Sequence, residues 1–208
     1  MLIRKHMEKR AFLFSGQGAQ YVGMGKRICE KSKTAREVFD EASEALGYDL
    51  KKMCLEGSKE ELTLTYHAQP AILTVSTAMY RICLEEGIRP DIMAGHSLGE
   101  ISALTCAGGI AFRDAVRIVR KRGEFMQEAV PVDKGRMIAA GTREAEKLEE
   151  ICKNASREGR KAVISNYNSR TQYVVSGDKK AVEEVAEKLE AEGIRVSYLN
   201  VSAPFHSP

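Results

Sequence analysis

The chain contains the stretch Ile92-Met-Ala-Gly-His-Ser-Leu-Gly-Glu100, a G-x-S-x-G pentapeptide that follows a short apolar run. Residues 92–94 are typical of the end of a buried strand, and residues 100–107 are typical of the start of a helix. In this context Ser97 lies on a strand-to-helix turn, with its hydroxyl exposed beside helix N–H groups. The bare pattern also fits a glycine-rich loop with an incidental serine, but the flanking strand and helix favour a nucleophile.

The sequence before this turn predicts alternating strands and helices. Residues 11–14 form another short apolar run, and the Ser15-Gly-Gln-Gly18 segment after it indicates a tight turn. Helical patterns follow at residues 21–31, 34–46 and 69–86, the last with Pro70 near its N-terminus, where proline is favourable. The alternation predicts an α/β layer structure.

The pattern changes after Pro131. A strand, a helix, two strands, a helix and a strand are predicted in turn, at residues 136–140, 143–155, 161–165, 172–176, 178–192 and 194–201. Asp178 is the expected N-cap of the second helix, and Gly193 ends it. This β-α-β-β-α-β order predicts a ferredoxin-like small subdomain at residues 132–201. It is inserted in a large subdomain of residues 11–131 and 202–208, and residues 1–10 are predicted to be an N-terminal extension.

Composition excludes several classes of protein. The net charge of +3 is too small to indicate a nucleic-acid binder. There is no apolar run of the roughly 18 residues that a membrane span needs, and the N-terminus lacks the apolar segment of a secretory signal. The five cysteines show no CxxC pair, so we expect reduced core thiols in a cytoplasmic protein. No metal-ligand cluster appears.

A nucleophilic serine needs a base, and the sequence offers four histidines. His6 lies in the predicted extension, His67 in a polar loop, and His96 beside Ser97, where its side chain should point away along the strand. His206, just after the last predicted strand, is therefore the candidate base that takes the Ser97 proton and later returns it to a thiol. The alternative for His206 is an ordinary loop histidine.

Arg122 is the candidate for binding a substrate carboxylate. In the helical pattern of residues 113–130, Arg122 shares an apolar face with Ala115, Val119 and Met126. A buried guanidinium needs an anionic partner, and its planar fork suits a carboxylate. An internal salt bridge or an arginine that reaches out from the helix edge would explain the pattern equally well.

The loop after the first strand is the candidate oxyanion hole. The glycines of Gly16-Gln-Gly18 let backbone N–H groups approach a ligand, and an oxyanion hole needs two such donors. The N–H of Leu98, next after the nucleophile, would supply one donor and that of Gln17 the other. The loop could equally bind phosphate, although it lacks the full Walker and dinucleotide-binding spacings.

Together these segments resemble the malonyl-CoA:acyl-carrier-protein transacylase family of fatty-acid and polyketide synthesis. The matching segments run in the family order from residue 11 onward. They are Phe12-Leu-Phe-Ser-Gly-Gln-Gly-Ala-Gln20, Gly23-Met-Gly25, Gln69-Pro-Ala71, Gly95-His-Ser-Leu-Gly-Glu100, Arg122-Gly-Glu-Phe-Met-Gln127, Asn166-Tyr-Asn-Ser169, Val174-Val-Ser-Gly177 and Ser202-Ala-Pro-Phe-His-Ser207.

The resemblance implies an α/β-hydrolase-like large subdomain and a ferredoxin-like small one. It implies that Ser97 is acylated, that His206 is its base and that Gln17 and Leu98 form the oxyanion hole. It further implies that Arg122 pairs with the malonyl carboxylate, and that Phe205 is typical of members selecting malonyl over methylmalonyl groups. The substrates and partners would be malonyl-CoA and an acyl carrier protein, with no cofactor, nucleic acid or membrane.

One departure concerns the C-terminus. Family members continue beyond the histidine motif with helices and a strand of the large subdomain, and with a residue whose carbonyl orients the histidine. We therefore expect the large subdomain to lack its C-terminal part. Two alternatives to transacylation remain: a serine acyl hydrolase or thioesterase, which would not need Arg122, and an inactive fragment of the transacylase.

Overall fold

The computed structural model describes residues 9–130, 134–199 and 203–208. Contacts within the chain divide it into two compact units, residues 1–124 and 125–208, and each is considered by itself. Most of the predicted extension and the predicted subdomain boundaries near residues 131 and 201 fall outside the described residues. Residues 203–208 group with the second unit, so their assignment to the large subdomain stays a prediction.

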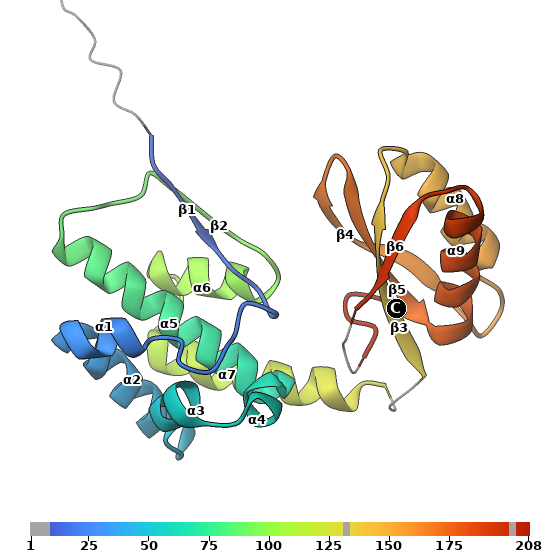
Figure 1. The fold of residues 1–208 in the computed structure, drawn as a ribbon. Coiled ribbons are helices and arrows are strands. Elements are labelled where there is room, and N and C mark those ends of the chain that lie inside the picture. The colour runs from blue at the N-terminus through green and yellow to red at the C-terminus, as the bar shows by residue number, and fades with distance from the viewer. Residues whose placement is uncertain (1–8, 131–133, 200–202) are drawn as a thin grey trace, which may run out of the picture. The chain divides into compact units, whose positions relative to one another are not determined.

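The first unit is an α/β structure that combines a two-stranded parallel sheet, β1-β2, with helices (Figure 1). Its elements are β1 (Ala11–Phe14), α1 (Lys26–Lys31), α2 (Lys33–Leu46), α3 (Leu50–Glu56), α4 (Lys59–Thr63), α5 (Thr65–Glu85), β2 (Ile92–Gly95), α6 (Leu98–Cys106) and α7 (Phe112–Glu128), the last turn of which belongs to the second unit. In the sheet, Ala11 lies opposite Ile92 and Phe14 lies opposite Gly95. Helix α6 packs against both strands, so the predicted strand-turn-helix around Ser97 is confirmed.

The helices of the first unit are held together by an apolar core. Helix α2 begins after Ser32, whose hydroxyl accepts from the Ala35 N–H at 3.1 Å. Its buried residues recur at helical spacing, and Val38 and Phe39 are fully buried against the other helices. Burial of this amphipathic face, rather than helix propensity, accounts for most of the stability of such a helix.

Helix α5 starts earlier than the sequence predicts. It begins at Thr65 rather than at residue 69, so Pro70 lies inside the helix and not near its N-terminus. Proline has no N–H to donate to the carbonyl of Tyr66 one turn before, which makes an interior proline costly. The short helices α3 and α4 were not predicted, because five to seven residues give too little periodicity.

The second unit has the predicted β-α-β-β-α-β order. Its elements are β3 (Gly135–Gly141), α8 (Ala145–Ala155), β4 (Ala162–Ser169), β5 (Gln172–Asp178), α9 (Lys179–Ala191) and β6 (Arg195–Tyr198). The strands form one antiparallel sheet in the order β4-β5-β3-β6, and α8 and α9 pack against it. Ile138, Val175 and Leu189 form part of its core. This is the ferredoxin-like arrangement.

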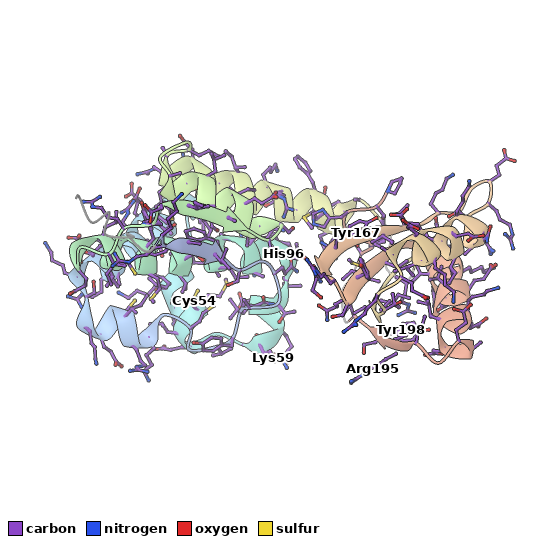
Figure 2. All side chains as sticks on the ribbon, turned by 90° about the horizontal axis from the view of Figure 1, so that it is seen from above. Cys54, Lys59, His96, Tyr167, Arg195 and Tyr198 are labelled. Atoms are coloured by element: carbon purple, nitrogen blue, oxygen red, sulfur yellow. The ribbon has the colours of Figure 1, made fainter. Side chains whose placement is uncertain are left out.

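Two details of this unit differ from expectation. Asp178 precedes α9 as predicted, but its carboxylate accepts from the Lys161 N–H at 2.6 Å instead of capping the helix. Strand β4 is longer than predicted and runs to Ser169. Its pairing with β5 contains two irregularities, and Tyr167, labelled in Figure 2, lies between them.

The cysteines are all free thiols, as expected. Cys29, Cys54 and Cys152 are buried, and Cys54 lies among the helices of the first unit (Figure 2), whereas Cys83 and Cys106 are only half-buried. Burial raises the pKa of the Cys54 thiol to about 12. Within the described residues, no helix is long and apolar enough to cross a membrane.

Candidate active site

Ser97 lies at a sharp, strained turn between β2 and α6. Its backbone has φ 53° and ψ −105°, a conformation that residues with a Cβ rarely adopt. The turn is closed by the Gly99 N–H, which donates to the His96 carbonyl at 2.9 Å, and by the Glu100 N–H, which donates to the Ser97 carbonyl at 3.1 Å. Strain of this kind persists where surrounding structure enforces it, and it is typical of a nucleophile elbow.

The two glycines of the pentapeptide explain why the turn can be this tight. A Cβ on Gly95 would lie 1.9 Å from the Gly99 carbonyl carbon, and a Cβ on Gly99 would lie 2.0 Å from the Phe14 carbonyl oxygen. Only hydrogen fits at both positions, so the pattern that predicts the elbow is required by its packing. The incidental-serine alternative does not account for these contacts.

Arg122 reaches the hydroxyl of Ser97 from α7. Its Nη2 donates to Ser97 Oγ at 3.1 Å, and its Nη1 donates to Gln69 Oε1 at 2.8 Å. As predicted, Ala115 and Val119 on the same helix are buried. Burial lowers the pKa of the Arg122 guanidinium, and the negative charge of Glu100 partly opposes this shift.

The hydrogen-bond partners of Arg122 are the neutral side chains of Gln69 and Ser97. Within the part of the chain that the structure describes, Arg122 forms no ion pair with a carboxylate, which disfavours the internal salt bridge. The guanidinium is half-buried, so an added anion would be recognised in partly desolvated surroundings.

The candidate oxyanion loop lies against the elbow. A Cβ on Gly16 would lie 2.5 Å from the His96 carbonyl oxygen and 2.9 Å from His96 Nδ1, so the loop after β1 contacts the turn. Leu98 is the first residue of α6, where backbone N–H groups have no partner within the helix. The side chain of Gln17 is held by Thr65, whose Oγ1 accepts from Gln17 Nε2 at 3.2 Å. The role of the Leu98 and Gln17 N–H groups as oxyanion donors stays a prediction.

The histidines occupy separate places. His96 directly follows β2 (Figure 2) and has its ring against Gly16, and His67 lies in the first turn of α5 rather than in a loop. His206 belongs to the second unit, where it has φ 59° in a turn closed by the Ser207 hydroxyl, which donates to the Pro204 carbonyl at 2.6 Å. Its pairing with Ser97 stays a prediction, and Ser202 of the same motif lies outside the described residues.

Several residues of the site were given no role from sequence. Gln69 is fully buried and accepts from Arg122, and Thr65 binds Gln17. The guanidinium of Arg120 lies over the rings of both Tyr48 and Tyr66. Thr65 was missed because α5 was predicted to begin at residue 69. Gln69 is a polar residue in an apolar segment, and that position could have indicated a buried polar contact.

Comparison with known proteins agrees with this geometry. Residues 11–208 match the family model described as acyl transferase domain. The chain is 50% identical over 202 residues to the malonyl CoA-acyl carrier protein transacylase of Bacillus subtilis (strain 168). This match covers 97% of this chain and 64% of that protein.

Solved structures give the same result. The transacylase of the same name from Coxiella burnetii superposes with a TM-score of 0.94 at 41% identity, covering 97% of this chain and 64% of that one. A chain from the structure of a type II PKS acyl-carrier protein in complex with its malonyl-transacylase superposes with a TM-score of 0.91 at 41% identity. The match covers 95% of this chain and 64% of that one. The chain thus spans half to two thirds of the length of the relatives it matches.

Proposed function

Because this chain belongs to the acyl transferase domain family, we propose that it transfers a malonyl group from malonyl-CoA to the phosphopantetheine thiol of an acyl carrier protein. The observation that carries this proposal is the guanidinium of Arg122, 3.1 Å from the hydroxyl of a serine on a strained elbow. This pairing joins a nucleophile to a group that recognises a carboxylate at the other end of a short acyl chain.

The first half-reaction acylates Ser97. The Oγ of Ser97 attacks the thioester carbonyl while His206 takes its proton. The negative charge that develops on the carbonyl oxygen is stabilised by the N–H groups of Leu98 and Gln17. Collapse of the tetrahedral intermediate breaks the carbon–sulfur bond, and the proton on His206 passes to the coenzyme A sulfur.

The second half-reaction repeats these steps in reverse with another thiol. His206 takes the proton of the phosphopantetheine thiol, the sulfur attacks the ester carbonyl, and Ser97 leaves and regains its proton. No cofactor is needed, because the thioester substrate supplies the activated acyl group. Water must be excluded from the ester, since hydrolysis would waste it.

Arg122 changes partners during the reaction. Before substrate binds, its two terminal nitrogens donate to Ser97 Oγ and Gln69 Oε1. The malonyl carboxylate offers two oxygens in one plane, which match the guanidinium fork better than one hydroxyl and one amide. Its binding therefore frees a lone pair of Ser97 Oγ for attack, so the carboxylate helps to activate the nucleophile.

A serine hydrolase or thioesterase remains the second candidate. It would use Ser97 and His206, with water in place of the carrier thiol. The position of Arg122 disfavours this reading, because a hydrolase of uncharged acyl groups has no use for a guanidinium against its nucleophile.

The free, buried thiols favour the cytoplasm as the place of action.

Intact-protein mass spectrometry tests the proposal. The protein is incubated briefly with malonyl-CoA beside a Ser97→Ala control, and peptide mapping locates the modification. We expect one malonyl increment on Ser97 of the parent and none on the control, followed by loss of the increment when an acyl carrier protein with a free phosphopantetheine thiol is added. An increment that persists in Ser97→Ala, or its absence from a parent that melts cooperatively, would contradict the proposal.

A further inference from the structure

The backbones of helices α5 and α7 approach closely at Gly123, next to Arg122. A Cβ on Gly123 would lie 2.5 Å from Tyr66 Cα and 2.8 Å from both the Thr65 carbonyl oxygen and the Tyr66 nitrogen. These are backbone atoms, which cannot yield as the end of a flexible side chain can. Glycine weakens a helix interior relative to alanine, so its presence in α7 is explained by this close approach.

The turn of α5 that Gly123 contacts also holds two parts of the site. Thr65 Oγ1 accepts from the side chain of Gln17, and Gln69 Oε1 accepts from Arg122 Nη1 at 2.8 Å. Thr65 and Gln69 are both buried. The separation of the two helices at Gly123 therefore fixes how far the guanidinium of Arg122 reaches from α7 toward Gln69 and Ser97.

Arg120 fixes the rotation of α7 at the same place. The carbon at the centre of its guanidinium lies 5.1 Å from the ring centroid of Tyr66 and 5.2 Å from that of Tyr48. Its Nε donates to Glu124 Oε1 at 2.9 Å, one turn along the same helix. A guanidinium held between two aromatic faces and a carboxylate has little freedom to swing.

We propose that Gly123 and Arg120 are positioning residues that hold the guanidinium of Arg122 at Ser97 and thereby set the preference for acyl groups that carry a carboxylate. This rests on the proposed function. Arg122 is the residue whose nitrogen reaches Ser97 Oγ, and Gly123 and Arg120 act on it through the placement of α7 on the first turn of α5. A displacement of about 1 Å in such a group can cost on the order of 100-fold in rate.

The test compares how fast Ser97 is acylated by malonyl-CoA and by acetyl-CoA, in the full chain. Gly123→Ala should lower the malonyl-to-acetyl ratio at least about tenfold, because only the malonyl donor uses Arg122. The control is Gly141→Ala, where the new Cβ would meet Arg195 O at an ordinary 3.6 Å. A purely structural role would reduce both rates together, so an unchanged ratio in Gly123→Ala would overturn the proposal.

Arg120 provides a second test if Gly123→Ala does not fold. Arg120→Met should lower the same ratio, and Arg120→Lys should restore part of it, because lysine keeps a cation between the two rings. Arg117→Met, on the exposed side of the same helix, is the matched control and should keep the parent ratio. Equal ratios in Arg120→Met and Arg117→Met would count against a positioning role for Arg120.

A crystal structure of either variant keeps the proposal distinct from the proposed function. If the parent transfers no malonyl group, the function fails, but the position of Arg122 can still be measured. We expect the separation between Arg122 Nη2 and Ser97 Oγ to grow from 3.1 Å to beyond hydrogen-bond range in Gly123→Ala. An unchanged separation would refute the positioning role whatever the activity.

Discussion

Replacing Arg122 by alanine tests whether the proposed carboxylate recognition can be separated from the proposed acylation of Ser97. The variant removes the guanidinium whose nitrogens lie 3.1 Å from Ser97 Oγ and 2.8 Å from Gln69 Oε1, and leaves the strained elbow in place. A bidentate contact with the malonyl carboxylate comprises two hydrogen bonds between charged groups. Taking about 1.5 kcal/mol for each, the lower end of the usual range, gives about 3 kcal/mol of lost transition-state stabilisation.

This free energy corresponds to a loss of about 150-fold in kcat/KM for the malonyl donor, since about 1.4 kcal/mol is a factor of ten. The acetyl donor has no carboxylate, so its slower reaction should be unchanged or faster once Oγ is relieved of its donor. Single-turnover acylation of Ser97, followed by intact mass, measures both rates.

Arg117→Ala is the matched control, because Arg117 lies on the same helix with its side chain exposed and bound to the Ala45 carbonyl and Asp114. It should leave both rates unchanged. Equal losses on the malonyl and acetyl donors in Arg122→Ala would refute the reasoning, because they would mean that the arginine supports the site as a whole and does not recognise the carboxylate.

Three further predictions concern stability. Gly99→Ala places a Cβ 2.0 Å from the Phe14 carbonyl oxygen and should cost about 4 kcal/mol or more; an unchanged Tm in calorimetry would contradict the packing. Burial raises the pKa of Cys54 from 9.0 to about 12, so the thiol of the unfolded chain ionises at a lower pH than that of the folded chain. The stability that the neutral thiol contributes is complete below pH 9 and should fall as the pH rises toward 12. Cys54→Ala should therefore show a smaller fall in Tm between pH 8 and pH 10 than the parent. Ser32→Ala removes the hydroxyl that caps α2 and should cost about 1 kcal/mol, detectable as a lower Tm, whereas Ser32→Asn should largely retain it.

The parts of the fold that the sequence predicted best are those with a strong local pattern. β1 has the predicted bounds, and the order of strands and helices in the second unit is confirmed. Such patterns record burial on one face of an element, which a single segment already displays. The start of α5 was wrong because proline is commonest in the first turn, and here tertiary packing holds it in the helix interior.

The position of the candidate site was predictable from the sequence, but its contacts were not. The G-x-S-x-G pattern located Ser97, and the apolar face of α7 indicated that Arg122 points inward. The hydrogen bond from Arg122 to Gln69 and the stacking of Arg120 between Tyr48 and Tyr66 join residues far apart in the sequence. No local signal in the sequence specifies which distant side chains meet.

Gly123 shows what a local signal for such a contact could look like. Within a helix of 17 residues, a glycine lowers helix stability and offers no side chain to bury, so it requires a compensating contact. Here the glycine directly follows the arginine that reaches Ser97, and the space it leaves is filled by the backbone of α5. A glycine beside a charged residue on the apolar face of a helix therefore indicates that two backbones meet there. Because backbones move less than side chains, a charge placed at such a point is held more firmly than one on an ordinary helix face.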